Sequence, residues 1–410
     1  MRRNRTIRFF ATGAAVALVL TGTAGAAVAA PSPDGAGKSV VSRAWTELDR
    51  TPAPGGFSSW AELMQMQHQL NTAATRIQEV AKATARSGYA NIVAAPENRE
   101  LVVYWQGRVP AAVQRVIAAQ SNSVPIRVVP ARYSEAQLSA EVQRLGRDSA
   151  YAEVSPMIDG SGIRVKQAAG RSARAAAPRS SVSVFPDGVN TGGNGVLFTR
   201  QNDFAPYWGG ARTQGCTTGF AIWWAGASRI LTAGHCGNNG QNVFDGGGDL
   251  MGPIFNDNDV RDTQMINVAG LGRVWDGPWT ETGFTKGVAG ATFSNVGNWL
   301  CTSGSRSGVR CNIRVSANNA SWFGRFPMVY ADQQQFVSAA GQGDSGGPVF
   351  ELPWPDDGRV IAKGTITGGV NGTFVPCTGE VWPGRVCSWR FVYADVTQAL
   401  AFYGATIVTG

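Results

Sequence analysis

Apolar residues recur at helical intervals in the first half of the chain. Between residues 57 and 90 the apolar positions are Leu63, Met66, Leu70, Ile77 and Val80. Residues three, four and seven positions apart lie on one face of an α-helix. This spacing therefore predicts one or two amphipathic helices over 57–90.

Further short elements are predicted up to about residue 165. They are a hairpin over 91–104, a helix over 109–121, a strand over 124–129 and a helix over 134–147. Pro96-Glu97-Asn98 supplies the turn of the hairpin, because these residue types favour turns. Ser134 and Gln137 match a capping box at the start of the last helix. Residues 57–165 are therefore predicted to form a small α+β domain.

After residue 180 the pattern changes to short apolar runs between Gly, Asn and Asp turns. The runs cover 196–199, 219–224, 229–232, 263–268, 347–350 and 360–367. Many short strands with regular turn signals are typical of an all-β sandwich or barrel. Only 395–403, at the C-terminus, has a helical pattern, and Asp395 and Gln398 resemble a cap pair there.

Composition changes at the same place. Residues after 180 hold 39 of the 52 glycines, ten of the 13 tryptophans and all six cysteines. The preceding stretch, 166–180, has mainly small and basic side chains and is predicted to be an exposed linker that proteases can cut. We therefore expect a domain boundary at 180/181.

The N-terminus has the three parts of a secretory signal peptide. Met1–Arg5 is basic, 9–29 is apolar, and Ala27-Val28-Ala29 matches the small-residue cleavage site. A membrane anchor is the alternative, but Gly and Thr dilute the apolar stretch and polar sequence follows at once. We expect 1–30 to be removed and the protein to be secreted.

The formal net charge of +8 is unevenly distributed. Residues 1–30 hold four Arg and no acidic residue, and 31–180 hold 18 basic against 12 acidic residues. Residues 181–410 hold 14 basic against 16 acidic residues and are therefore close to neutral. A basic surplus in parts expected to be cut away does not favour a nucleic-acid partner, and no membrane partner is expected after signal cleavage.

Six cysteines in an exported chain are consistent with three disulfides. They fall as sequence neighbours, Cys216 with Cys236, Cys301 with Cys311 and Cys377 with Cys387. Sequence alone allows 15 pairings of six cysteines, of which we favour the nearest-neighbour one. No Cys-x-x-Cys pair is present and the chain has two histidines, so we expect neither a metal site nor a cofactor.

Two motifs carry the chemistry, Leu231–Cys236 (LTAGHC) and Gly343–Pro348 (GDSGGP). A serine hydroxyl is a poor nucleophile near neutral pH and needs an adjacent base. His235 suits that role because imidazole accepts and returns a proton near neutrality. The other histidine, His68, falls on a polar helical face and is expected to be an exposed helix residue.

In these motifs the chain resembles the chymotrypsin-like serine endopeptidases, over about residues 190–405. The resemblance is to the secreted bacterial branch, which includes the streptogrisins and the alpha-lytic-protease-like enzymes. It implies two antiparallel six-stranded β-barrels with a C-terminal helix in 181–410, preceded by the α+β prosegment. It also implies His235 as base, Ser345 as nucleophile and the backbone N–H groups of Gly343 and Ser345 as an oxyanion hole. In that branch Asp344 would be a structural hydrogen-bond partner.

The catalytic carboxylate is chosen among six aspartates between the two motifs. In the family it opens a short apolar strand, and Asp262, followed by Thr263–Ile266, fits that pattern. Asp259 is the second choice. The remaining four lie in Gly- and Asn-rich turns and are expected to serve turn formation; they are Asp245, Asp249, Asp257 and Asp276.

Substrate-binding residues are also implied by the resemblance. Thr367, Gly368 and Gly369 resemble the edge segment that pairs with the substrate backbone, although a strand with a glycine bulge is the alternative. Ala339 stands where trypsin-like members have the aspartate that selects Lys or Arg. Glutamate-selecting members use a second pocket histidine, which this region lacks, so an apolar or aromatic preference is favoured. The chain departs from many relatives in having no cysteine in 338–342.

The combined prediction is a secreted serine endopeptidase that cleaves protein or peptide substrates and works as a monomer. The domains are a signal peptide (1–30), a prosegment (31–180) and a protease domain (181–410). The prosegment is expected to assist folding and to block the active site, because barrels rich in non-local contacts fold slowly. A retained accessory domain is the alternative for 31–180, and a catalytically inactive binding protein is the alternative for the whole chain.

Overall fold

The computed structural model describes residues 48, 51–85, 87–168, 182–186, 200–281 and 284–410. The predicted signal peptide (1–30), residues 169–180 of the predicted linker (166–180) and the apolar run at 196–199 lie outside these residues. Among the described residues, no helix has the length and apolar character needed to cross a bilayer.

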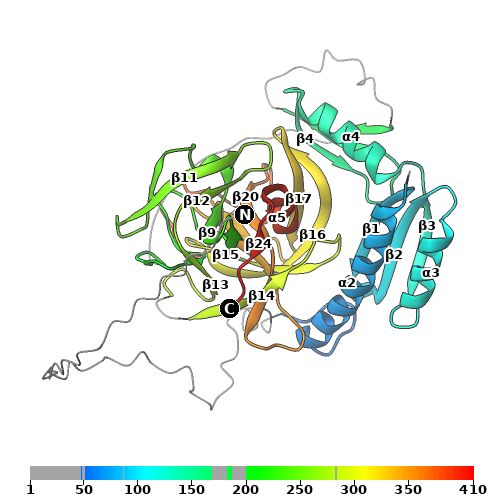
Figure 1. Cartoon of the computed structure of the whole chain (residues 1–410), viewed down its shortest axis with the longest axis horizontal. Coiled ribbons are helices and arrows are strands. Elements are labelled where there is room, and N and C mark those ends of the chain that lie inside the picture. The colour runs from blue at the N-terminus through cyan, green and yellow to red at the C-terminus, as the bar shows by residue number, and fades with distance from the viewer. Residues whose placement is uncertain (1–47, 49–50, 86, 169–181, 187–199, 282–283) are drawn as a thin grey trace, which may run out of the picture. The chain divides into compact units, whose positions relative to one another are not determined.

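The part before residue 168 contains both helices and strands, as predicted (Figure 1). Its elements are α2 (Trp60–Ala83), β1 (Tyr89–Ala95), η1 (Pro96–Asn98), β2 (Glu100–Gln106), α3 (Ala111–Gln120), β3 (Ile126–Ala131), α4 (Glu135–Gly146), β4 (Tyr151–Pro156) and β5 (Ile163–Gln167). A single helix occupies most of 57–90. The capping box of Ser134 and Gln137 is formed at the start of α4. His68 lies exposed on α2. The antiparallel hairpin of β4 and β5 was not predicted from the sequence.

A closed ring of six antiparallel strands forms one barrel of the C-terminal part. The strands are β15 (Trp299–Gly304), β16 (Gly308–Trp322), β17 (Arg325–Gln333), β23 (Arg390–Asp395), β20 (Arg359–Gly369) and β19 (Pro348–Glu351). Each pairs with the next, and β19 pairs with β15 to close the ring. Buried apolar side chains such as Val349, Ile366 and Phe391 fill it.

A second set of six strands forms an antiparallel sheet. Its order is β10 (Asn242–Phe244), β11 (Leu250–Asn258), β12 (Thr263–Ile266), β9 (Ala227–Thr232), β8 (Ala221–Trp224) and β24 (Thr406–Ile407). The last strand comes from the C-terminus and follows the helix α5 (Val396–Tyr403). Asp395 caps α5 by accepting hydrogen bonds from the amides of Thr397 and Gln398. The mostly β fold with a C-terminal helix is therefore confirmed.

The remaining strands extend or join these sheets. They are β6 (Val184–Pro186), β7 (Tyr207–Gly209), β13 (Gly270–Trp275), β14 (Thr285–Ala291), β18 (Ala340–Gly341), β21 (Phe374–Val375) and β22 (Cys387–Ser388). The pairings of β13 with β7, β14 with β20 and β5 with β6 are parallel. Through β4, which pairs with the end of β16, the β4–β5 hairpin joins the sheet of the barrel.

Three disulfides join the cysteines that are neighbours in sequence. They are Cys216–Cys236, Cys301–Cys311 and Cys377–Cys387. The first holds the segment before β8 against the turn after β9, and the second crosses the β15–β16 hairpin. The third closes a loop between β21 and β22. Each therefore limits the freedom of a short segment of the unfolded chain.

Candidate active site

His235 lies in the short helix η2 (Gly234–Cys236), directly after β9. The neighbouring Cys236 is bonded to Cys216, which holds this turn in place. The His235 side chain is 32% exposed, so one part of the ring faces solvent while another faces the protein. A histidine placed in this way can exchange a proton with a molecule bound at the surface.

Asp262 lies immediately before β12 and is fully buried. Its Oδ1 is 2.9 Å from His235 Nδ1 and accepts a hydrogen bond from the His235 backbone N–H at 3.0 Å. Antiparallel pairing of β12 with β9 sets Gln264 opposite Thr232 and so brings Asp262 to the turn that carries His235. A Cβ on Gly234 would lie 3.1 Å from the Asp262 Cα, so glycine permits this close approach.

The hydrogen bonds to Asp262 favour its charged form. Burial acts to raise the pKa of the carboxyl group, but the hydrogen bonds and charge of His235, together with the charge of Arg325, outweigh it and lower the pKa. An ionised carboxylate on Nδ1 selects the tautomer in which Nδ1 carries the proton. The other ring nitrogen, Nε2, is then free to accept a proton.

The other aspartates between the motifs show no hydrogen bond to His235 among the described residues. Asp245 accepts hydrogen bonds from the amides of Gly247 and Asp249 and so closes a turn. Asp259, the second choice for the catalytic carboxylate, contributes its backbone carbonyl to the Asp262 amide at 3.4 Å. Among the described residues, Asp262 is the carboxylate that contacts His235.

Arg325 is a contact of Asp262 that was not predicted from the sequence. Its Nε lies 3.2 Å from Asp262 Oδ1. Arg325 opens β17 at the tip of the β16–β17 hairpin, and β4 pairs with the same tip through Trp322. No local pattern marks this residue, because its approach depends on how a long hairpin folds back over the loop before β12.

Ser345 lies in the turn between β18 and β19. The flanking Gly343 and Gly346 have φ values of +89° and +83°, a region that side chains disfavour. A Cβ on Gly346 would overlap Thr232 Oγ1, so this turn packs directly against the end of β9. The Ser345 hydroxyl donates to the Thr367 carbonyl at 3.4 Å, and the described residues show no hydrogen bond between Ser345 and His235.

The two amides predicted to form an oxyanion hole are those of Gly343 and Ser345. Within the part of the chain that the structure describes, neither the Gly343 nor the Ser345 N–H donates a hydrogen bond. The Gly343 carbonyl is held by the Thr217 hydroxyl at 2.7 Å, and the Ser345 carbonyl by the Thr217 amide at 2.8 Å. Both amides are therefore available to an incoming oxygen atom.

Thr367, Gly368 and Gly369 form the end of β20. Pairing of β19 with β20 ends at Thr365, whereas β23 pairs with β20 as far as Gly369. The other edge of this segment is therefore unpaired in the described ladders, as β-strand addition requires. Added Cβ atoms on Gly368 and Gly369 would lie 2.9 Å from the Trp322 ring and 2.8 Å from Ser388 Cβ.

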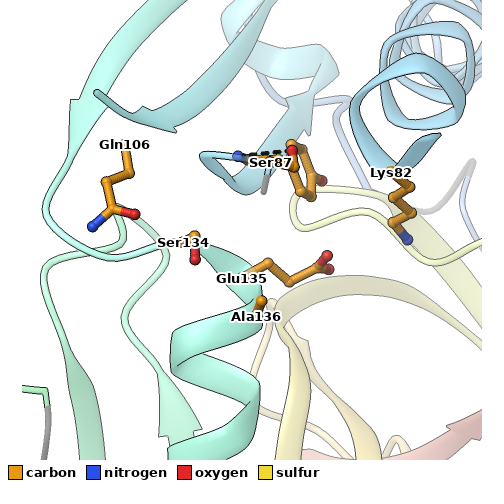
Figure 2. A pocket seen from close by; sticks show the side chains of 7 residues that line it. Lys82, Ser87, Gln106, Ser134, Glu135 and Ala136 are labelled. Atoms are coloured by element: carbon orange, nitrogen blue, oxygen red, sulfur yellow. Dashed lines mark hydrogen bonds between the residues drawn. The ribbon is translucent and has the colours of Figure 1, made fainter. Parts of the chain in front are cut away.

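His235, Cys216 and Cys236 lie close enough together to suggest a metal site. The two sulfur atoms are bonded to each other, however, and a disulfide lacks the thiolates that metal ions bind. A cavity of 430 Å³ lies elsewhere, between the end of α2 and the start of α4, and includes Lys82 and Glu135 in its lining (Figure 2). None of the predicted site residues lines that cavity.

No protein-family model matches the chain. Solved structures of serine proteases are similar to about half of it. A glutamic-acid-specific serine protease with a histidine triad in substrate binding is 25% identical, with a TM-score of 0.37, and covers 49% of this chain and 100% of its own. A Nocardiopsis protease is 24% identical, with a TM-score of 0.36 and coverages of 49% and 98%. Thermobifida fusca protease A is 22% identical, with a TM-score of 0.36 and coverages of 50% and 98%.

Proposed function

We propose that the protein is a secreted serine endopeptidase, made as a preproenzyme, that uses Ser345, His235 and Asp262. The observation that carries the proposal is the buried Asp262 carboxylate on Nδ1 of a partly exposed histidine, next to the glycine-flanked Ser345 turn. A carboxylate, an imidazole and a serine in these roles activate a hydroxyl for attack on a carbonyl.

In the proposed reaction Ser345 Oγ attacks the carbonyl carbon of the scissile peptide while His235 Nε2 takes the hydroxyl proton. The Gly343 and Ser345 amides stabilise the oxyanion that forms. His235 then returns the proton to the leaving amine, the C–N bond breaks and an acyl-enzyme remains. Water attacks this ester with His235 again acting as base, and the carboxylic acid and free Ser345 are released.

The proposed substrate is an extended peptide that pairs with the free edge at Thr367–Gly369. Ala339 is buried and brings no charge to this region, which supports apolar or aromatic side chains over Lys or Arg. A cleavage profile over a peptide library tests this preference, and selective cleavage after basic residues would contradict it.

We also propose that 31–180 is a prosegment that is cut away. In support, β4 pairs with the end of β16, and Lys166 Nζ donates to the Asn371 carbonyl at 3.4 Å, just beyond the proposed substrate edge. Pairing of β5 with β6 (Val184–Pro186) places three residues beyond the expected boundary in the same sheet. N-terminal sequencing of the secreted protein tests the division. A mature chain that begins at Ala30 or Pro31 would favour a retained accessory domain.

Labelling with a serine-directed fluorophosphonate tests the activity itself. The processed protein should be labelled at Ser345 and cleave casein, and the matched Ser345→Ala variant should do neither. Absence of both labelling and cleavage in the wild-type protein would favour the inactive binding protein. If Asp262→Asn left turnover near normal, the carboxylate role would pass to Asp259.

A further inference from the structure

Arg385 is a buried arginine in the loop closed by the Cys377–Cys387 disulfide. All five of its guanidinium N–H groups have an acceptor. Nε donates to the Gln342 carbonyl at 3.2 Å, Nη1 to the carbonyls of Thr378 at 3.0 Å and Glu380 at 2.6 Å, and Nη2 to Ser307 Oγ at 2.9 Å and Asp344 Oδ2 at 3.1 Å. A planar guanidinium held in this way has little freedom to move.

Two of these acceptors flank Gly343. A trans peptide is planar, so its C=O and N–H point in opposite directions. The Gln342–Gly343 bond is not among the cis peptides of the chain. By holding the Gln342 carbonyl, Arg385 Nε therefore directs the Gly343 N–H to the opposite side of that peptide. On the other side of Gly343, Arg385 Nη2 holds the Asp344 side chain.

Asp344 in turn fixes the turn around Ser345. Its carboxylate is fully buried and accepts hydrogen bonds from the amides of Arg306 at 2.9 Å, Ser307 at 3.0 Å and Gly341 at 2.8 Å. Arg385 supplies the charge that pairs with this carboxylate, with both side chains fully buried. Removal of one member of a buried ion pair leaves the other charge without compensation, which strongly favours rearrangement.

The disulfide attaches the Arg385 loop to the same turn. Cys387 lies opposite Gly341 in the pairing of β22 with β18. A Cβ on Gly341 would overlap Cys387 Sγ, so the bridge packs directly on this strand. In addition, the Gln342 amide donates to the Val386 carbonyl at 3.0 Å. The loop and the turn therefore form one hydrogen-bonded unit.

We infer that Arg385 is a positioning residue for the oxyanion hole, acting through Gln342 and Asp344 to aim the Gly343 N–H. This inference rests on the proposed peptidase function. Through Arg385, the Cys377–Cys387 loop would help to stabilise the transition state of the reaction. An arginine with a purely structural role would instead affect the stability of the fold alone.

Arg385→Met and Arg385→Lys in the processed protein test the inference. The lysine variant carries a single ammonium group, which cannot pair with Asp344 and reach the Gln342 carbonyl in the same geometry. Each variant should lose kcat by about 10²-fold with KM within about threefold, because a misplaced catalytic group lowers the rate without removing substrate contacts. Affinity for a peptide aldehyde, which forms an oxyanion, should fall in parallel, and affinity for the matched peptide alcohol should not.

The matched control is Arg359→Met. Arg359 pairs with Asp357 at the surface, at the far end of β20, and its loss should leave kcat unchanged. If Arg385→Met does not fold, Arg385→Lys provides the same measurements. Unchanged kcat and aldehyde affinity in the folded variant would overturn the inference while the peptidase proposal stands. A wild-type protein without fluorophosphonate labelling or cleavage would instead overturn the peptidase proposal.

Discussion

Asn71 on α2 connects the proposed prosegment to the barrel through buried polar groups. Its Oδ1 accepts hydrogen bonds from Asn295 Nδ2 at 3.0 Å and Asn298 Nδ2 at 2.9 Å, and its Nδ2 donates to Glu351 Oε2 at 3.2 Å. Asn71→Ala should leave one N–H of Asn295 Nδ2 and one of Asn298 Nδ2 without an acceptor, while Asn298 Nδ2 keeps the Ala94 carbonyl at 3.4 Å and Glu351 keeps Lys363 at 2.7 Å. A buried donor that loses its acceptor costs about 1–3 kcal/mol.

Because two donors lose an acceptor, we expect the free energy of unfolding of the intact chain to fall by about 2–6 kcal/mol. The assay is urea unfolding of the Ser345→Ala protein, followed by tryptophan fluorescence. Trp60 and Trp299 report on this contact because their rings lie 5.1 Å apart, edge to face. The control is Thr72→Ala on the exposed face of the same helix, expected to change stability by no more than about 0.5 kcal/mol. Equal unfolding midpoints for Asn71→Ala and Thr72→Ala would refute the reasoning.

Three further predictions concern charged groups. Asp262→Asn should lower peptide turnover by about 10⁴-fold with the fold intact, measured by steady-state kinetics and circular dichroism. Arg325→Gln should raise the pKa of Asp262, because it removes a positive charge that favours the ionised carboxylate. The stabilisation that a carboxyl group with a lowered pKa provides is lost as the pH falls through that pKa. Acid unfolding of the variant should therefore begin at a higher pH than that of the wild type. Burial raises the pKa of Glu135, against the charge of Lys82 and a hydrogen bond from Asn319, so its contribution to stability should be lost as pH rises through that pKa (Figure 2). Glu135→Gln should remove this pH dependence of the free energy of unfolding, measured in urea. If the free energy of unfolding changed with pH equally in the variant and the wild type, Glu135 would not be its source.

Local patterns were sufficient for the elements whose signals lie within a few residues. The apolar spacing from Leu63 to Val80 predicted α2, and Ser134 with Gln137 predicted the start of α4 together with its capping box. Short-range side-chain periodicity and capping determine such elements. The β4–β5 hairpin was missed although Asp159-Gly160 between its strands is a turn signal. Its two strands are short, and pairing of β4 with β16, which is distant in sequence, stabilises them.

The chain itself determined the residue types available for chemistry. One histidine in a glycine-rich β region, one GDSGGP turn and an aspartate opening a short apolar strand restrict the candidates to a few positions. The short apolar strand after Asp262 favoured it over Asp259, but three residues are enough to turn a carboxylate toward or away from a histidine, so the sequence alone did not fix the geometry. The pairing of β12 with β9 brings Asp262, and not Asp259, against His235.

Only the tertiary structure revealed the residues that act from a distance in sequence. Arg325 reaches Asp262 across 63 positions through a hairpin that folds back, and Arg385 reaches Asp344 across 41 positions through a disulfide-closed loop. Both contacts depend on pairing between strands that are distant in sequence. The chain entropy that such pairing costs is offset by the interactions of the whole barrel. A sequence specifies which groups can react, whereas the closure of its sheets decides which charges surround them.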